Sequence, residues 1–202
     1  MDADQNADRR ADPERLGTAA GVLAPVVALG AIALAALRSP TFTWAGSALS
    51  DLGAPGTRTA WLFNGGLALG GALALPFAWR LWRAARNRAE RAGAVLLALD
   101  AVALALVGVF PIGTALHAPA AVSFFLLLSL ALWTYSAGNL LAGERRRGAA
   151  TVALGVVTLG AWVVWAAALR DLAPGLALPE AVGAVALGAW TATTAVRLWR
   201  TA

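Results

Sequence analysis

The sequence contains no cysteine and no lysine, and it has a single histidine, His117. Without cysteine, neither a disulfide framework nor a thiolate metal site can form. One imidazole is also too few for the multi-histidine zinc sites of hydrolases. Carboxylates, hydroxyls, arginines and one histidine are therefore the groups able to carry chemistry, and the sequence predicts no metal ion and no cofactor.

Charge of either sign is scarce, at 13% of 202 residues, whereas 59% of the residues are hydrophobic. Soluble domains carry about 25% charged residues, so most of this chain is expected to lie in lipid. The high pI comes from arginines that stand between apolar segments. A nucleic-acid interface needs basic residues clustered on one face, so the expected partners are membrane lipids and not nucleic acid.

Long hydrophobic runs are what the sequence has in abundance. Six of them reach the length of about 17–25 residues that a helix needs to cross a bilayer. The predicted fold is an all-α membrane protein, a six-helix bundle with spans at about 16–37, 59–79, 92–112, 116–142, 149–169 and 178–199. Residues 1–15 mix charges without apolar periodicity, which predicts a disordered cytoplasmic tail ahead of one transmembrane domain at 16–202.

Arginines alternate between the connections and thereby predict the topology. Basic residues near helix ends are retained on the cytoplasmic side. Thirteen of the 16 arginines fall on the tail, the second and fourth connections and the C-terminus, and three fall elsewhere: Arg38, Arg58 and Arg170. The expected location is a cell membrane, with both termini cytoplasmic and the first, third and fifth connections outside.

Two Gly-x-x-x-Gly motifs, Gly17 to Gly21 and Gly66 to Gly70, have the spacing that lets membrane helices approach closely. Packing inside the monomer is favoured over a dimer face, and the oligomeric state stays open.

Polar residues concentrate in the first outer connection, between Trp44 and Asn64. If this stretch forms a short helix, Ser47, Ser50 and Asp51 share one face. Ser and Asp at such places commonly cap backbone N–H groups or pair with arginine, and this reading is favoured over a ligand or catalytic site. Asn64 is a candidate ligand-binding residue or a helix–helix hydrogen bonder.

The other outer connections add His117, Arg170 and Asp171, and Glu180 follows them. His117 opens the fourth span, where an imidazole bonded to a backbone carbonyl and a proton-transfer group are both reasonable readings. Arg58, Arg170 and Asp171 are grouped with Asn64 as candidate ligand-binding residues.

Asp100 lies within the third span. An ionised carboxylate inside a membrane is costly and faces a partner or a cavity, so it marks a functional site by default. The alternative is a protonated acid bonded to a neighbouring helix, for example through Thr158 or Ser129.

Three segments carry a family resemblance: Leu49-Ser50-Asp51-Leu52-Gly53, then Leu62-Phe63-Asn64-Gly65-Gly66, then Gly108-Val109-Phe110-Pro111 leading to His117. In order and placement they resemble a prokaryotic membrane-protein family catalogued as domain of unknown function 998, with a composition similar to haloarchaeal members. The resemblance covers roughly residues 16–199 and implies a six-helix integral membrane protein without an established activity. Many similar sequences have Asn where this chain has Ser47, which weakens Ser47 as a nucleophile.

The sequence is compatible with three functional hypotheses. The leading hypothesis is an outer polar pocket of Ser50, Asp51, Asn64 and His117 that binds a lipid headgroup or small polar ligand. The first alternative is a membrane-embedded lipid hydrolase or transferase with Asp51, His117 and Ser50 as catalytic residues. The second is a proton-coupled carrier that uses Asp100. Whether the chain is an enzyme is left open.

Overall fold

The computed structural model describes residues 12–200. Its long helices are α2 (Pro13–Arg38), α3 (Ala60–Ala84), α4 (Arg88–Val109), α5 (His117–Leu141), α6 (Arg145–Val164) and α7 (Ala177–Arg200). A 3-10 helix, η1 (Leu49–Gly53), lies between α2 and α3, and a π-helical segment, η2 (Trp165–Leu169), extends α6. Residues 1–11 of the predicted tail lie outside the described residues, and residues 13–15 belong to α2.

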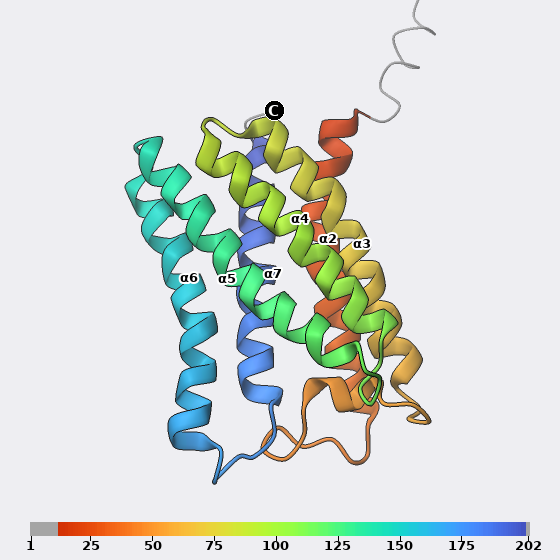
Figure 1. Ribbon diagram of the computed structural model, residues 1–202. Helices are drawn as coiled ribbons and strands as arrows, with labels where there is room; N and C mark the ends of the chain where they lie inside the picture. Colours follow the sequence, from red (N-terminus) through yellow and green to blue (C-terminus); the bar gives the residue numbers. More distant parts are fainter. Residues whose placement is uncertain (1–11, 201–202) are drawn as a thin grey trace, which may run out of the picture.

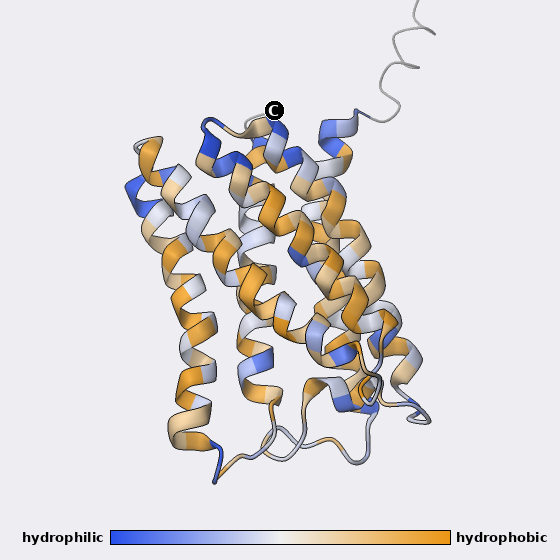
Figure 2. Ribbon diagram, viewed as in Figure 1, coloured by the Kyte–Doolittle hydropathy of each residue, from blue (hydrophilic) through white to orange (hydrophobic). Residues whose placement is uncertain are grey.

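Each of the six helices is long and apolar enough to cross a membrane. Figure 2 shows apolar residues along the middle of the bundle and hydrophilic residues gathered mostly at its two ends. Local caps set where helices begin: Asp12 accepts a hydrogen bond from the Glu14 N–H just before Pro13, and Asn87 accepts one from the Glu90 N–H. The prediction of an all-α, multi-pass membrane protein is confirmed.

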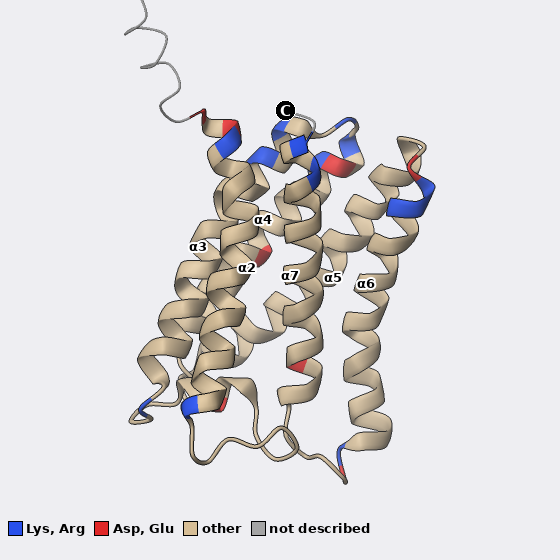
Figure 3. Ribbon diagram, turned by 180° about the vertical axis from the view of Figure 1, so that it is seen from behind, with Lys and Arg blue, Asp and Glu red and all other residues tan. Residues whose placement is uncertain are grey.

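The two ends of the bundle differ in composition. We call one the termini end, because α2 starts there and α7 finishes there, together with the α3–α4 and α5–α6 connections (Figure 1). The other is the loop end, formed by the α2–α3, α4–α5 and α6–α7 connections. Arginines crowd the termini end and are sparse at the loop end (Figure 3).

Helices α2 and α3 pack closely because glycines of one helix meet the other. A Cβ atom added at Gly66 would lie 2.1 Å from the Cβ of Ala31, and one added at Gly70 would lie 2.8 Å from that of Ala28. Gly17 and Gly21 meet α3 in the same way, at Pro76 and Phe77. Lipid gives helices no hydrophobic drive to associate, so close backbone approach supplies the attraction. Both glycine motifs thus pack inside the monomer, as predicted.

Helix α6 is the most peripheral helix. Its buried residues are the small ones that form a single stripe, Gly148, Thr151, Gly155 and Thr158. Residues spaced three and four apart occupy one face of a helix. The remaining faces of α6 are apolar and exposed, as expected for a helix surrounded by lipid.

The first and last connections of the loop end are joined through their backbones. The Gly175 N–H donates to the Ala45 carbonyl over 2.8 Å, and the Ala177 N–H donates to the Ser47 carbonyl over 2.9 Å. A Cβ atom at Gly175 would lie 2.3 Å from the Ser47 oxygen, so only glycine permits this approach. This contact places η1 against the start of α7.

Candidate functional site

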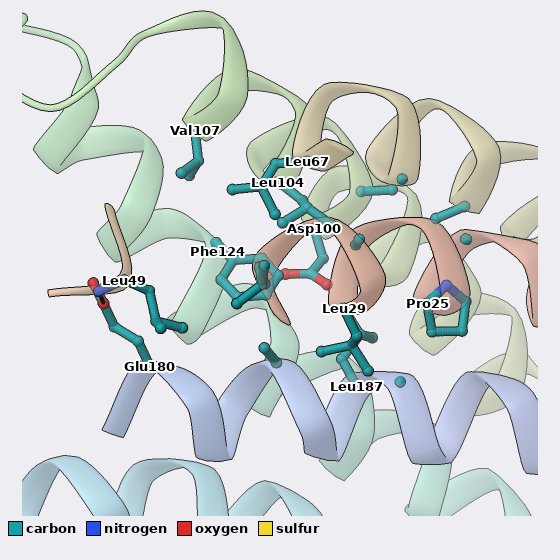
Figure 4. A pocket seen from close by; sticks show the side chains of 18 of the residues that line it. Pro25, Leu29, Leu49, Leu67, Asp100, Leu104, Val107, Phe124, Glu180 and Leu187 are labelled. Carbon is teal, nitrogen blue, oxygen red and sulfur yellow. Dashed lines mark hydrogen bonds between the residues drawn. The ribbon is translucent and has the colours of Figure 1, made fainter. Parts of the chain in front are cut away.

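A cavity of about 80 Å³ lies within the bundle. It is lined by residues of α2, η1, α3, α4, α5 and α7, and α6 takes no part. Its walls are almost entirely apolar, with leucine, alanine and phenylalanine side chains facing the space (Figure 4). The polar side chains that reach it are Ser50, Asp100, His117, Glu180 and Thr191. A cavity needs roughly 10–15 Å³ to hold one water, so this space admits several waters or a small apolar group.

Glu180 lies in the first turn of α7 and holds η1 in place. Its carboxylate accepts a hydrogen bond from the Leu49 N–H over 2.6 Å (Figure 4). The N–H groups at the start of a helix have no partner within that helix, so a carboxylate there satisfies them. Glu180 was not among the predicted site residues, although an acid between the apolar residues of a helix start is the signal that could have singled it out.

His117 begins α5 and is 9% exposed. Its Nδ1 lies 2.8 Å from the Phe110 carbonyl oxygen. A carbonyl can only accept, so Nδ1 carries the proton that is donated and Nε2 is the nitrogen able to accept from a ligand. The predicted backbone-bonded imidazole is what the structure shows, and the same side chain lines the cavity.

Ser50 is 6% exposed and is the polar residue of η1 that lines the cavity. Thus Ser50, His117 and Glu180 contribute to one cavity wall from three different elements, η1, α5 and α7. All three lie near the loop end, where η1 and the first turns of α5 and α7 are found (Figure 1).

Asp51 and Asn64 hold η1 rather than line the cavity. Asp51 is exposed, and its Oδ2 accepts from the Ala48 N–H over 2.8 Å, so it caps η1 from within. The Asn64 amide donates to the Gly53 carbonyl over 2.9 Å. The capping reading of the first connection therefore holds for Asp51, and a role for these two residues in ligand binding or catalysis stays a prediction.

Arg58, Arg170 and Asp171 also lie outside the cavity lining. Arg58 is exposed. Arg170 and Asp171 approach each other at 3.7 Å with exposed side chains, a geometry that contributes little stability. The structure does not bring these residues to His117.

Asp100 is fully buried in the middle of α4 and faces the cavity. Figure 4 shows its carboxyl group directed into the space between Leu29 and Phe124. Neither oxygen has a hydrogen-bond partner among residues 12–200. The partners suggested by the sequence are engaged elsewhere: the Thr158 hydroxyl donates to the Leu154 carbonyl and the Ser129 hydroxyl to the Phe125 carbonyl.

An unpaired carboxylate in apolar surroundings is costly when ionised. Buried polar groups normally have a partner, and the rare exception calls for an explanation such as a bound ligand, ion or proton. Asp100 is therefore a cavity residue without a protein partner among residues 12–200, and Ser50, His117 and Glu180 supply polar groups of the cavity near the loop end.

Comparison with known proteins identifies a family but no characterised relative. A family model described as "Protein of unknown function (DUF998)" matches residues 22–197, nearly the whole helical bundle. No curated protein and no solved structure matches the chain.

Proposed function

The chain belongs to the DUF998 family of proteins of unknown function, and we propose that it binds a small amphipathic molecule inside its helical bundle. The ligand's polar head lies at Ser50, His117 and Glu180, its apolar part lies along the leucine and phenylalanine walls, and a second group able to form a hydrogen bond faces Asp100. The observation that carries this proposal is one continuous apolar cavity whose polar residues are few and separated along it. Ligand sites are commonly apolar with a small number of placed polar groups.

The distribution of arginine supports an orientation for this site. Arginines at the termini end far outnumber those at the loop end (Figure 3), and such an excess marks the cytoplasmic side. The proposed topology therefore has both termini in the cytoplasm and the loop end outside. The headgroup position is then reached from the outer leaflet of the cell membrane.

The size of the cavity limits the ligand. A space of about 80 Å³ suits a compact amphipathic molecule better than the chains of a phospholipid. A small apolar metabolite that carries a hydroxyl or carboxyl group fits this description.

Native mass spectrometry of protein purified in mild detergent tests the proposal. The wild type is expected to retain a bound small molecule. Ala184 lines the cavity, so Ala184→Leu fills part of it and should remove the bound mass. Ala189 lies on the same helix with its side chain exposed, so Ala189→Leu is the matched control and should retain the ligand. Equal retention in both variants, or no bound molecule in the wild type, would contradict the proposal.

A second candidate function, a proton-coupled carrier, is favoured by Asp100. A buried carboxyl group without a protein partner, directed into a cavity, is what a proton-binding site in a transporter requires. Binding of the molecule found in the wild type should then depend on pH, and Asp100→Asn should abolish that dependence. If Asp100→Asn leaves the pH profile unchanged, the carrier proposal fails while the binding proposal stands.

A further inference from the structure

A second concave site lies at the termini end, between α5, α6 and α7. This groove has a volume of about 480 Å³ and is separate from the cavity described above. Its basic residues are Arg147, Arg197 and Arg200, and its polar wall includes Tyr135, Asn139 and Thr151. We call it the arginine groove.

The arginine groove exists because α6 contacts the bundle along one narrow stripe. The stripe includes Thr151, whose hydroxyl accepts a hydrogen bond from Trp190 Nε1 over 3.2 Å. The Trp190 ring packs edge-on against Tyr135, with ring centroids 5.2 Å apart. Aromatic side chains therefore form an apolar wall of the groove, while guanidinium groups occupy its end nearest the termini.

Positive charge is in excess around the arginine groove. Glu144 pairs with Arg147, with Arg197 at 3.1 Å, and with Arg86. Arg86 also pairs with Glu90. Among residues 12–200, three guanidinium groups thus share two carboxylates, Glu90 and Glu144, and Arg200 adds a fourth positive charge.

Arg200 itself forms no ion pair within the described part of the chain, and it is exposed at the rim. It is the arginine of the groove best able to contact an added anion without losing a protein partner.

The groove lies at the depth where a membrane protein meets lipid headgroups. Exposed tryptophans at the same end of the bundle, Trp79, Trp82 and Trp199, are of the type that concentrates at the membrane–water interface. Guanidinium groups bind phosphate oxygens through paired N–H donors. A basic, hydroxyl-bearing rim above an aromatic wall matches the phosphate and glycerol of a phospholipid.

We propose that the arginine groove binds the phosphate headgroup of an anionic phospholipid, with Arg147, Arg197 and Arg200 around the phosphate. This site is independent of the cavity at the loop end, because no residue lines both. It gives a role to Arg200, which has no ion pair within residues 12–200, beside two arginines that share Glu144.

The test measures binding of short-chain phosphatidylglycerol and phosphatidylcholine to the purified full chain in detergent. Native mass spectrometry at several lipid concentrations gives the affinities. Phosphatidylglycerol should bind more tightly than phosphatidylcholine. Arg200→Gln should weaken phosphatidylglycerol binding about fivefold, since one interfacial arginine contributes on the order of 1 kcal/mol. Arg200→Lys should retain most of the affinity because it keeps the charge.

Arg146→Gln is the matched control, because Arg146 is exposed at the same end of the bundle but does not line the groove. It should leave the affinity within about twofold of the wild type. Equal losses in Arg146→Gln and Arg200→Gln would indicate diffuse attraction to the whole end and overturn the proposal. Inorganic phosphate provides a further arm: saturable binding of free phosphate without preference for phosphatidylglycerol would identify a soluble anion as the ligand and also overturn it.

Discussion

Helix α4 buries two carboxylates in opposite surroundings. Glu90, in its first turn, accepts hydrogen bonds from the Arg86 backbone N–H over 2.7 Å and from the Arg86 guanidinium. Asp100, farther along the same helix, has no partner among residues 12–200 and faces an apolar cavity. The first carboxylate has backbone and guanidinium partners in the α3–α4 connection, whereas the second lines a cavity without such a partner. Two equally buried acids thus differ in their partners, and the unpaired one is the acid for which we propose a role in ligand binding.

The largest effect is expected for Glu90→Gln. This change leaves Arg86 facing a neutral side chain, and removing one partner of a buried pair costs about 3–5 kcal/mol. Arg86 is partly exposed to solvent, so we expect the lower part of that range or less, about 2–3 kcal/mol, in unfolding by denaturant in detergent micelles.

The control for Glu90→Gln is Asp171→Asn, which breaks a pair with Arg170 at 3.7 Å in which both side chains are exposed. It should lose less than about 1 kcal/mol. Similar losses in the two variants would remove the distinction between Glu90 and an ordinary surface acid.

Asp100→Leu should change the free energy of unfolding in the opposite direction. Replacing an unpaired buried polar group with an apolar one removes a cost of about 1–3 kcal/mol, so the free energy of unfolding should rise or stay unchanged while ligand retention falls. Such a trade of function for stability is common at binding sites. A loss of stability as large as that of Glu90→Gln would show that Asp100 has a structural partner. The distinction between a paired Glu90 and an unpaired Asp100 would then be wrong.

A smaller effect is expected on the stability of the protein at low pH, through Glu144 at the termini end. Partial burial opposes ionisation of Glu144, but its hydrogen bonds to Arg147 and Arg86 outweigh burial and lower its pKa below the ordinary value of 4.5. A carboxyl group with a lower pKa in the folded state contributes stability that is present above pH ~4.5. That contribution is lost as the pH falls through the folded-state pKa.

Removing Glu144 should therefore flatten the acid side of the stability profile. We expect Glu144→Gln to cost about 1 kcal/mol near pH 7 and to lose stability less steeply than the wild type below pH ~4.5. Thermal unfolding between pH 3 and pH 7 measures both. Asp171→Asn, at the exposed pair of the loop end, should leave the profile unchanged; a shift as large as that of Glu144→Gln would argue against the arginine cluster as its cause.

The smallest effect is expected for Asp51→Asn. An asparagine oxygen still accepts from the Ala48 N–H, so η1 keeps its cap and the loss should stay below about 0.5 kcal/mol. Untargeted lipid and metabolite profiles of a deletion strain, complemented with wild type or Asp51→Asn, should not differ. A changed profile would restore Asp51 as a catalytic residue and favour the membrane-embedded hydrolase or transferase.

Much of the fold could be predicted from the sequence, because bilayer thickness fixes the length of each apolar run and all connections except the first, between Arg38 and Ala60, are short. The lateral arrangement could not be predicted in the same way. Helices rich in Ala, Leu and Gly are apolar on every face, so their sequences do not indicate which face meets which neighbour. The sequence thus placed Asp100 inside the membrane, facing either a partner or a cavity, but did not decide between the two.

The candidate site was predictable only in part, for a related reason. Ser50 and His117 were predicted, and both line the cavity. Glu180 was noted beside the outer connections but not selected as a site residue, because its partner, the Leu49 N–H, lies 131 residues away in the sequence. Asp51, by contrast, makes a local contact three residues away, which is why capping could be foreseen from spacing alone.

The backbone pairing of residues 45–47 with residues 175–177 also has a consequence for biosynthesis. A chain is made from its N-terminus, so η1 leaves the ribosome long before the carbonyls of Ala45 and Ser47 can meet Gly175 and Ala177. The hydrogen bond from the Leu49 N–H to Glu180 likewise forms only after Glu180 has been synthesised. The loop end of the cavity is therefore completed only when the sixth span is inserted, and a nascent or truncated chain without α7 lacks the part of the cavity wall that α7 supplies.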